Sequence, residues 1–441
     1  MTKDEMIQKY VTIRVEITLH PERGFMSALQ VQNEIGKLQK ALLHCPGNET
    51  RNYPDGQFNQ VFTLRPSNSS FDLEKALAEH RSYSDILKNE GVELFYVEDL
   101  LIEALDQSNR ARQSFIDLYI SECGVGGIEL QSAIRDLLEG AKSSLDLVQT
   151  AIKGIRYGQV FDTEREAHSL AALTGDAYLP EDLLVNPLNT MWFTRDPVSV
   201  IGSGATLNHM YWPERNREVI AYQTIFNYHP AFMGTPQFFK HESTYHLEGG
   251  DVHNLNSENV AIGISQRTEP LAIDSLAREV LWNKDSTIES VWAIKVPYDE
   301  LCIHLDTYFS RVDYDTFLID RTLLEEAEVY RITRGRREWT TRAAIVEGGI
   351  REAIGMALGS NSLRFILCGG SNPAAAERER ANNAASTLCL KPGKVCVYGE
   401  NTETNAALEQ AGIELVPISI FELTSGFGGP DCLCLPLARS I

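Results

Sequence analysis

The sequence predicts an α/β fold on the strength of three observations. Short apolar runs bounded by turn residues, such as residues 260–265, have the length and composition of buried strands. Other segments are rich in helix-forming residues and stop at glycine. A helix end, a glycine and the start of a strand also recur in register at two distant places, which indicates a repeated strand-helix-strand unit.

The N-terminal part of the chain contains the first strand and helix of this pattern. Residues 34–46 include an apolar run that ends in Pro-Gly and predict an early strand and turn. Residues 73–89 form a predicted helix that stops before Gly91, and the following VELFYVEDL alternates as a strand does. The sequence ILKNEGVELF at 86–95 is matched by ALEQAGIELV at 407–416, and this match is the recurrence that indicates an internal repeat.

The segment from about residue 101 to 156 differs, because one helical pattern follows another with little sign of a strand. Apolar residues in LQSAIRDLLEG follow the i, i+3, i+4 spacing of an amphipathic helix. Gly140 ends that helix, and Ser144 can cap the next one. We interpret this segment as a helical insertion. After Gln159 strands and turns return, with further apolar runs at residues 365–368 and 395–398.

Composition argues against several classes of protein. A net charge of -21 over 441 residues disfavours nucleic acid or an anionic membrane as a partner, since both require basic patches, whereas a small cation would suit this field. No signal peptide and no apolar run of bilayer length can be identified. Eight cysteines without CxxC spacing indicate reduced thiols. We therefore expect a soluble, cytoplasmic protein.

One stretch, TSGFGGPDCLCLP at residues 424–436, is suited to chemistry. Its glycines and proline allow a tight turn, and a cysteine at the end of such a turn can face a cleft. Cys432 is the candidate nucleophile, because a thiolate is the strongest common nucleophile among side chains. A buried packing role is the alternative for Cys432, and it is our interpretation of Cys434.

Three other segments supply a candidate proton carrier and carboxylates. LCIHLDTYFS places Cys302, His304 and Asp306 at alternate positions, which on a strand would put all three side chains on one face. HLEGGDVH offers Glu248, and WFTRDP offers Asp196 just before a proline. Each residue alone also has a structural interpretation, since Asp-Pro often starts a turn and a histidine can be a hydrogen-bonded core residue. The combination of these groups favours a catalytic site.

FTRDP, EGGD, HLDT and a glycine-rich turn that ends in cysteine occur here in one order. With these motifs the sequence resembles the arginine deiminases of the guanidine-modifying superfamily, over a stretch from Glu34 to Pro436. The resemblance implies a five-bladed propeller of ββαβ units, the pentein fold, with an inserted all-helical domain. Residues 1–100 and 158–441 would form the catalytic propeller, and residues 101–157 the helical insertion.

The resemblance also implies a role for each candidate catalytic residue. Asp196 and Asp306 would grip the N–H edges of a guanidinium, and Cys432 would attack its carbon. His304 would act as general acid and then as general base, and Glu248 would orient it. The expected reaction is the hydrolysis of L-arginine to L-citrulline and ammonia through a covalent S-alkylthiouronium. No metal or organic cofactor is required.

Other matching positions would bind the rest of the substrate. Arg215 and Arg267 look like the residues that hold an α-carboxylate, for which a planar fork of donors is suited. The further candidate substrate-binding residues are Phe193, Gly426, Phe427 and Thr190.

Three positions depart from the family pattern at what we expect to be the rim of the site. Phe427 replaces an arginine at the entrance, Asp431 replaces a basic residue before the cysteine, and Thr190 stands where an asparagine is common. The preferred guanidine could therefore differ from free L-arginine.

Several alternatives stay open at this point. An amidinotransferase or an arginine dihydrolase could use the same fold, and a non-catalytic binding protein is a further alternative from another class. A homo-oligomer is compatible with the resemblance. A metal site is a sharper rival, and its ligands would come from His246, Glu248, Asp251 and His253, with Cys302, His304 and Asp306.

Overall fold

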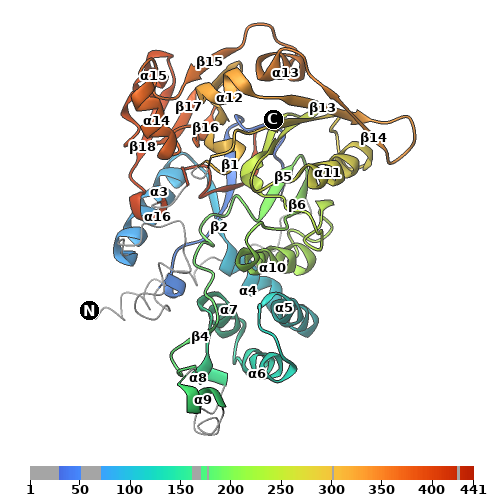
Figure 1. The fold of residues 1–441 in the computed structure, drawn as a ribbon, viewed down its shortest axis with the longest axis vertical. Helices are drawn as coiled ribbons and strands as arrows, with labels where there is room; N and C mark the ends of the chain where they lie inside the picture. Colours follow the sequence, from blue (N-terminus) through green and yellow to red (C-terminus); the bar gives the residue numbers. More distant parts are fainter. Residues whose placement is uncertain (1–28, 51–70, 161–169, 176–177, 300–301, 425–427) are drawn as a thin grey trace.

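The computed structural model describes residues 29–50, 71–160, 170–175, 178–299, 302–424 and 428–441 (Figure 1). Among these residues the strands form six sheets, and five of the sheets contain three or more strands. None of these described sheets closes on itself. In the described part of the chain, no helix has both the length and the apolar character needed to cross a membrane. The fold is α/β, as predicted.

One order of elements recurs in the five larger sheets: two antiparallel strands, a helix, and a third strand parallel to the second. In one of them β5 (Val198–Ile201) pairs with β6 (Gly204–Leu207), and α10 (Pro213–Tyr228) leads to β7 (Gln237–Phe239). Gly202 lies in the turn between β5 and β6 with φ of 61°, a value that favours glycine. The unit is therefore ββαβ.

The other four sheets repeat this order, with insertions in one of them. Their elements are β8 (Val252–Asn256), β9 (Asn259–Ile264), α11 (Pro270–Trp282) and β10 (Ser290–Lys295); β11 (Phe309–Arg311), β12 (Thr316–Ile319), α12 (Arg321–Glu326) and β15 (Arg364–Leu367); β16 (Leu388–Lys391), β17 (Lys394–Tyr398), α15 (Thr402–Gln410) and β18 (Glu414–Ile418); and β19 (Leu435–Arg439), β1 (Leu38–Leu43), α3 (Leu73–Asn89) and β2 (Glu93–Tyr96). The predicted repeat is confirmed, because α3 passes into β2 and α15 into β18 in the same way.

Further elements decorate these units. β13 (Val329–Arg334) and β14 (Thr341–Ile345) extend the sheet of β8 to β10, and their hairpin projects from the body in Figure 1. The remaining helices of this part are α13 (Gly349–Leu358), α14 (Pro373–Ala381) and α16 (Phe421–Thr424), and the 3-10 turns are η2 (Asn48–Thr50), η3 (Gly249–Asp251) and η4 (Leu305–Thr307).

The sheet of β1 joins distant parts of the chain. β1 pairs antiparallel with β19 and parallel with β2. Arg439 Nη1 donates to the Gly36 carbonyl at 3.0 Å, and the Lys37 N–H donates to Ser440 Oγ at 2.9 Å, across 403 positions of sequence in each case. These contacts anchor the strand that follows Cys432.

The described helices between β2 and β5 are α4 (Val97–Asp106), α5 (Asn109–Glu122), α6 (Ile128–Glu139), α7 (Ser144–Lys153), α8 (Tyr157–Val160) and α9 (Leu170–Thr174), accompanied by the short strands β3 (Ile155–Arg156) and β4 (Leu183–Val185). Most of these helices lie in the predicted helical segment 101–156, and α8 and α9 lie beyond it. The expected boundary at residue 101 falls inside α4, because this helix follows β2 directly. Ser143 caps α7 by accepting a hydrogen bond from the Asp146 N–H, so the predicted cap at Ser144 is wrong by one residue.

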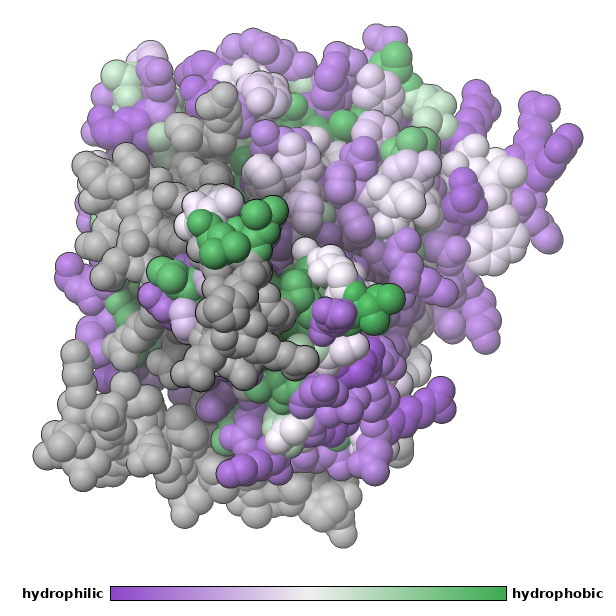
Figure 2. All heavy atoms as spheres, turned by 60° about the horizontal axis from the view of Figure 1, so that its bottom comes forward, coloured by the Kyte–Doolittle hydropathy of each residue, from purple (hydrophilic) through white to green (hydrophobic). Residues whose placement is uncertain are grey.

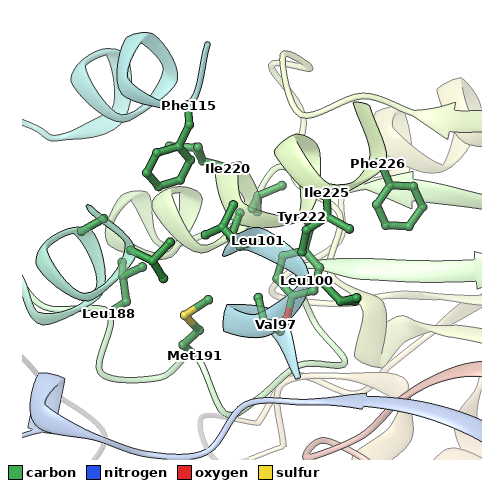
Figure 3. Packing of buried hydrophobic residues seen from close by; sticks show 14 of the residues in the cluster. Val97, Leu100, Leu101, Phe115, Leu188, Met191, Ile220, Tyr222, Ile225 and Phe226 are labelled. Atoms are coloured by element: carbon green, nitrogen blue, oxygen red, sulfur yellow. The ribbon is translucent and has the colours of Figure 1, made fainter. Parts of the chain in front are cut away.

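Helices α4 and α5 pack against α10 through a shared apolar core. Leu101, Phe115 and Ile220, one from each of these helices, belong to the buried cluster shown in Figure 3. Residues 216–226 of α10 are buried on every face of the helix. The helical stretch therefore fixes α10, whose first turns also carry polar residues of the candidate site.

Candidate active site

His304 and Glu248 form a buried hydrogen-bonded pair. Glu248 precedes η3, and its Oε2 lies 2.7 Å from His304 Nε2. Its other oxygen accepts a hydrogen bond from the Tyr211 backbone N–H at 2.9 Å. Gly250 lies against the imidazole, where a Cβ would come within 2.7 Å of Nδ1, so a side chain at this position would displace the histidine. The EGGD motif thus both holds and makes room for His304.

The pair carries opposite charges at neutral pH. Burial disfavours a charged imidazole, but the carboxylates of Asp196 and Glu248 outweigh burial and raise the pKa of His304 to about 9. Burial also disfavours the Glu248 carboxylate, yet Arg267 and His304 lower its pKa to about 2. Asp196 Oδ1 lies 3.9 Å from His304 Nδ1. The site therefore holds a protonated histidine that can act as an acid.

The HLDT segment is not a strand, so that prediction is wrong. His304 caps the 3-10 turn η4, in which Thr307 Oγ1 donates to the His304 carbonyl at 2.6 Å. The turn brings Asp306 to the site beside His304, but Cys302 packs elsewhere, with its Sγ 3.6 Å from the Arg380 carbonyl. Two of the three predicted side chains therefore reach the site.

Cys432 contacts two polar groups through its sulfur. Its Sγ lies 3.3 Å from Asp306 Oδ2 and 3.4 Å from Ser386 Oγ. The glycines of the preceding turn are required by close approach: a Cβ at Gly428 would lie 2.5 Å from the Phe193 ring, and one at Gly429 would lie 2.4 Å from the Ser386 carbonyl oxygen. The turn thus presses the cysteine against segments that are distant in sequence.

The surroundings of the sulfur are acidic. Burial and then the carboxylates of Asp306 and Asp196 raise the pKa of the Cys432 thiol well above its usual value. Burial also raises the pKa of Asp306 to about 7, with His304 opposing this effect and Asp431 adding to it. The free site therefore favours a protonated thiol, and a bound cation would shift the balance toward the thiolate.

Asp196 and Asp306 each keep one oxygen that is not hydrogen-bonded. Asp196 Oδ2 pairs with Arg215 Nη1 at 2.8 Å, and Asp306 Oδ2 accepts from Cys432. Among the described residues, neither Oδ1 has a hydrogen-bond partner, although both are buried. Buried carboxylate oxygens without donors cost free energy, and a planar cation with several N–H groups would satisfy them.

Arg215 is engaged by carboxylates of the chain itself. Its Nε and Nη2 donate to Glu218 Oε1 and Oε2 at 3.1 and 2.9 Å, in addition to the bond with Asp196. Thr190 Oγ1 donates to Glu218 Oε1 at 2.6 Å. Sequence reasoning missed Glu218, which lies three residues after Arg215 on α10, a helix that was not predicted.

Arg267 approaches the same Glu248 oxygen that bonds His304. Its Nη1 is 3.7 Å from Glu248 Oε2, and its guanidinium lies 5.2 Å from the Tyr211 ring centroid and 5.7 Å from that of Trp212. Arg267 is buried, so it is not the surface arginine that its sequence context would suggest.

Asp431 does not lie at the rim, which corrects the sequence-based expectation. Its carboxylate is buried, and Oδ2 is 3.7 Å from Arg195 Nε. Arg195 also pairs with Glu34 at 3.3 Å and donates its backbone N–H to the Cys432 carbonyl at 3.3 Å. Asp431 is drawn inward because this buried guanidinium needs carboxylate partners. Gly426 and Phe427, the other predicted residues of this turn, lie outside the described residues.

The rival metal site around His246 and His253 does not form. Among the described residues, the one group of potential ligands whose donor atoms lie within 4.8 Å of one another is Asp196, Glu248 and His304. His304 Nε2 and Glu248 Oε2 bond to each other at 2.7 Å, which favours an ion pair over shared coordination of a metal.

The comparisons with protein families and with known proteins identify the same family. The family model for arginine deiminase matches residues 68–439. An arginine deiminase from Treponema denticola is 36% identical over 416 residues, which cover 94% of this chain and 99% of that protein. One from Clostridium perfringens is 37% identical over 415 residues, covering 93% and 98%.

A solved structure shares the fold. An amidinotransferase of saxitoxin biosynthesis from Microseira wollei superposes with a TM-score of 0.50 at 13% identity, covering 94% of this chain and 98% of that one. At this level of identity the likeness concerns the fold alone.

Proposed function

This chain belongs to the arginine deiminase family, and on that premise we propose that its buried cluster of Cys432, His304, Glu248, Asp196 and Asp306 is the catalytic machinery. The chain hydrolyses a guanidino C–N bond and converts L-arginine to L-citrulline and ammonia. The observation that carries the assignment of residues is the pair of buried carboxylates, each with an unpaired oxygen, beside a thiol and a charged imidazole.

The substrate guanidinium is gripped by Asp196 and Asp306. Its N–H groups supply the donors that the two Oδ1 atoms lack, and its positive charge offsets the repulsion between these carboxylates. A cation next to the sulfur also lowers the pKa of the Cys432 thiol, so the nucleophile is armed when the substrate binds.

In the first chemical step the Cys432 thiolate adds to the guanidinium carbon. His304, charged at neutral pH, donates its proton to one amino group of the tetrahedral adduct. The C–N bond to that group breaks, ammonia leaves, and an S-alkylthiouronium is left on the sulfur. Glu248 holds the imidazole in place and stabilises its charge before the transfer.

In the second step the neutral His304 takes a proton from a water molecule, which attacks the same carbon. Collapse of this adduct breaks the C–S bond, returns the thiolate, and yields the urea group of citrulline. The remaining proton of the attacking water leaves with ammonia as ammonium. The imidazole is again protonated, so both catalytic groups are restored.

The rest of the substrate is bound by residues around this centre. We assign Arg215 and Arg267 to binding of the α-carboxylate. Phe193 and Thr190 would make further contacts with the substrate, as would Gly426 and Phe427 from the glycine-rich segment before Cys432. Arg215 must exchange part of its bonding to Glu218 or Asp196 to perform this task, since its guanidinium is already paired with both.

The five ββαβ sheets are assigned as the blades of a propeller around the site, with the helical stretch as an insertion. The recurrence of one strand order in five sheets supports this architecture. Residues 1–100 and 158–441 would form the propeller, and residues 101–157 the insertion. Because α4 begins at Val97, we propose that the insertion starts there rather than at residue 101.

Product analysis tests the proposed function. Purified protein is incubated with L-arginine, and citrulline, ornithine and ammonia are measured together for the wild type, Cys432→Ala and Cys434→Ala. Cys434 is a matched control, because it is a fully buried thiol two residues from the nucleophile and packs in the core. We expect equal amounts of citrulline and ammonia from the wild type and from Cys434→Ala, and none from Cys432→Ala.

Other outcomes identify the alternatives. Ornithine with excess ammonia would mean a dihydrolase, and ornithine that forms only with an added amine would mean an amidinotransferase. Full activity of Cys432→Ala would refute covalent catalysis by this residue. The absence of any product would reject L-arginine as the substrate and make agmatine the next guanidine to assay.

A further inference from the structure

A serine that no motif singled out lies against the nucleophile. Ser386 Oγ is 3.4 Å from Cys432 Sγ, and the side chain is fully buried. The other polar contact of the sulfur is Asp306 Oδ2 at 3.3 Å. An ionised carboxylate accepts hydrogen bonds and cannot donate one. A bound guanidinium keeps Asp306 ionised, and the Ser386 hydroxyl is then the one of these two described contacts that can donate to a thiolate.

The backbone holds Ser386 in this position. Ser386 lies between α14 and β16, and its N–H donates to the Asn383 carbonyl at 3.0 Å. Asn383 has φ of 51°, so the chain makes a sharp turn just before the serine. A Cβ at Gly429 would lie 2.5 Å from Ser386 Cβ and 2.6 Å from its Oγ. The glycine of the nucleophile turn thus leaves the space that the hydroxyl occupies.

A hydrogen-bond donor beside the Cys432 sulfur favours the thiolate, which its other surroundings disfavour. Burial raises the pKa of the Cys432 thiol. The carboxylates of Asp306, Asp196 and Asp431 raise this pKa further, whereas the hydrogen bond from Ser386 lowers it. The charge of a guanidinium is available only while substrate is bound. A fixed neutral donor stabilises the thiolate at every stage at which negative charge resides on sulfur.

We propose that Ser386 is a further catalytic residue, whose hydroxyl donates a hydrogen bond to the Cys432 sulfur as the thiolate forms and again as it leaves the covalent intermediate. The inference rests on the proposed role of Cys432 as nucleophile. No proton is transferred from the serine, so the balance of atoms in both chemical steps is unchanged.

The neighbouring residue provides a matched control. Thr387 is also buried, and its Oγ1 lies 2.8 Å from Ser310 Oγ rather than from the sulfur. Ser386→Ala and Thr387→Val each remove one buried hydroxyl from adjacent positions. The two variants differ in whether the lost hydrogen bond reaches the nucleophile.

The first measurement is the rate of Cys432 alkylation by iodoacetamide as a function of pH, read by mass spectrometry of the peptide that contains this residue. We expect the pH midpoint of alkylation to rise by about one unit in Ser386→Ala and to stay unchanged in Thr387→Val. This readout needs no substrate turnover. It therefore reports on the hydrogen bond even if the proposed reaction is wrong, which the Cys432→Ala product assay tests separately.

The second measurement is steady-state kinetics with L-arginine. We expect kcat to fall by about 10- to 100-fold in Ser386→Ala with little change in KM, because the lost bond matters most when charge is on sulfur. Ser386→Thr keeps the hydroxyl and should recover most of the alkylation midpoint, which separates loss of the donor from a folding defect. The proposal is overturned if Ser386→Ala and Thr387→Val show the same alkylation midpoint and the same kcat.

Discussion

The charge on His304 depends on two carboxylates, since burial by itself would favour the neutral ring. Asp196 and Glu248 raise its pKa to about 9, so the imidazole is charged in neutral solution. Asp196, together with Asp306, also raises the pKa of the Cys432 thiol, which burial raises most. In the free protein the imidazole is therefore charged and the Cys432 thiol is protonated, and under the proposed mechanism a bound substrate cation shifts that thiol toward the thiolate.

Glu248→Gln tests the origin of this charge. The amide keeps the size of the side chain but removes the negative charge, so the pKa of His304 should fall and the basic limb of the kcat profile should move from near pH 9 to lower pH. At neutral pH we expect kcat to fall by about 10- to 100-fold. The measurement is kcat between pH 5 and pH 10, with Glu269→Gln as a control because Glu269 bonds the His246 backbone instead. A basic limb that stays near pH 9 would exclude Glu248 as its cause.

The site residues could be predicted from the sequence where they belong to a recognisable motif, and could not be predicted elsewhere. The five catalytic candidates stand in four motifs, and the structure brings all five within one cluster. Ser386 stands in NNAASTLCL, where its contact with Cys432 depends on how two distant turns pack. Asp431 was assigned to the rim because of its neighbour in sequence, but the partner that draws it inward is Arg195, more than two hundred residues away.

Among the elements, α10 connects the helical stretch to the site. Its first turn carries Arg215, which pairs with Asp196, and its other faces pack against α4 and α5. A polar site on a helix is held in place only as firmly as the apolar side chains around that helix are packed. The helical stretch therefore contributes to the site without touching the reacting atoms.

Ile220→Ala tests the packing of α10. Ile220 is fully buried between α10 and its neighbours, so the cavity should lower the free energy of unfolding by about 2 to 5 kcal/mol. Ile128→Ala on α6 is the matched control, because Ile128 is 83% exposed and its loss should change stability by less than about 0.5 kcal/mol. Chemical denaturation of both variants measures the difference. Equal losses would mean that α10 is not anchored by this core.

A buried histidine at the end of β1 ties that strand to α4. His44 Nδ1 lies 3.0 Å from Glu98 Oε2, and Nε2 lies 3.3 Å from Glu49 Oε1. Burial opposes the charged ring, but the two carboxylates raise its pKa from 6.5 to about 10. Because the pKa is higher in the folded state, the stabilisation is complete below pH 6.5 and is lost as the pH rises toward 10.

His44→Gln should therefore destabilise the protein in a manner that depends on pH. At pH 6 we expect a loss of about 3 to 5 kcal/mol in the free energy of unfolding, as for a buried ion pair that loses one partner. At pH 10 the loss should be clearly smaller, since the wild-type histidine is itself becoming neutral. Urea denaturation at both values measures this difference. A loss that is the same at pH 6 and pH 10 would show that the charge on His44 is unimportant.

Helices and strands could be predicted from the sequence where the residues that determine them lie within the same segment. The predicted helix at 73–89 has those bounds in α3, because helix formers and a following glycine define it within its own sequence. The segment around His304 alternates like a strand but forms a 3-10 turn. The Leu305 N–H there donates to Asp251 Oδ1 at 2.8 Å, a contact between separate segments that local periodicity cannot reveal.

For the whole molecule, the net charge of -21 would attract small cations, and the substrate arginine is a cation. Among the described residues on the face shown in Figure 2, hydrophilic ones cover much of the top and right, and apolar side chains gather near the middle. An acidic protein raises the local concentration of small cations, and salt screens this attraction beyond about 10 Å at 0.1 M ionic strength.

The value of kcat/KM for L-arginine should therefore fall as salt is added. Between about 10 mM and 500 mM NaCl we expect a decrease of about 2- to 10-fold, carried mainly by KM, because the chemical step is buried and weakly screened. Potassium glutamate serves as a second salt to separate screening from binding of chloride. If kcat/KM is flat in both salts, the net charge has no part in capturing the substrate.

The pairing of β1 with β19 has a consequence for how the protein is made. On the ribosome, β1 emerges long before its antiparallel partner β19, which follows Cys432 in the chain. Until β19 is made, the nascent chain carries an incomplete sheet around β1, and until Cys432 is made it lacks the proposed nucleophile. If Cys432 is the nucleophile as proposed, a product that stops before it should not consume arginine, and activity should appear only after β19 has been made.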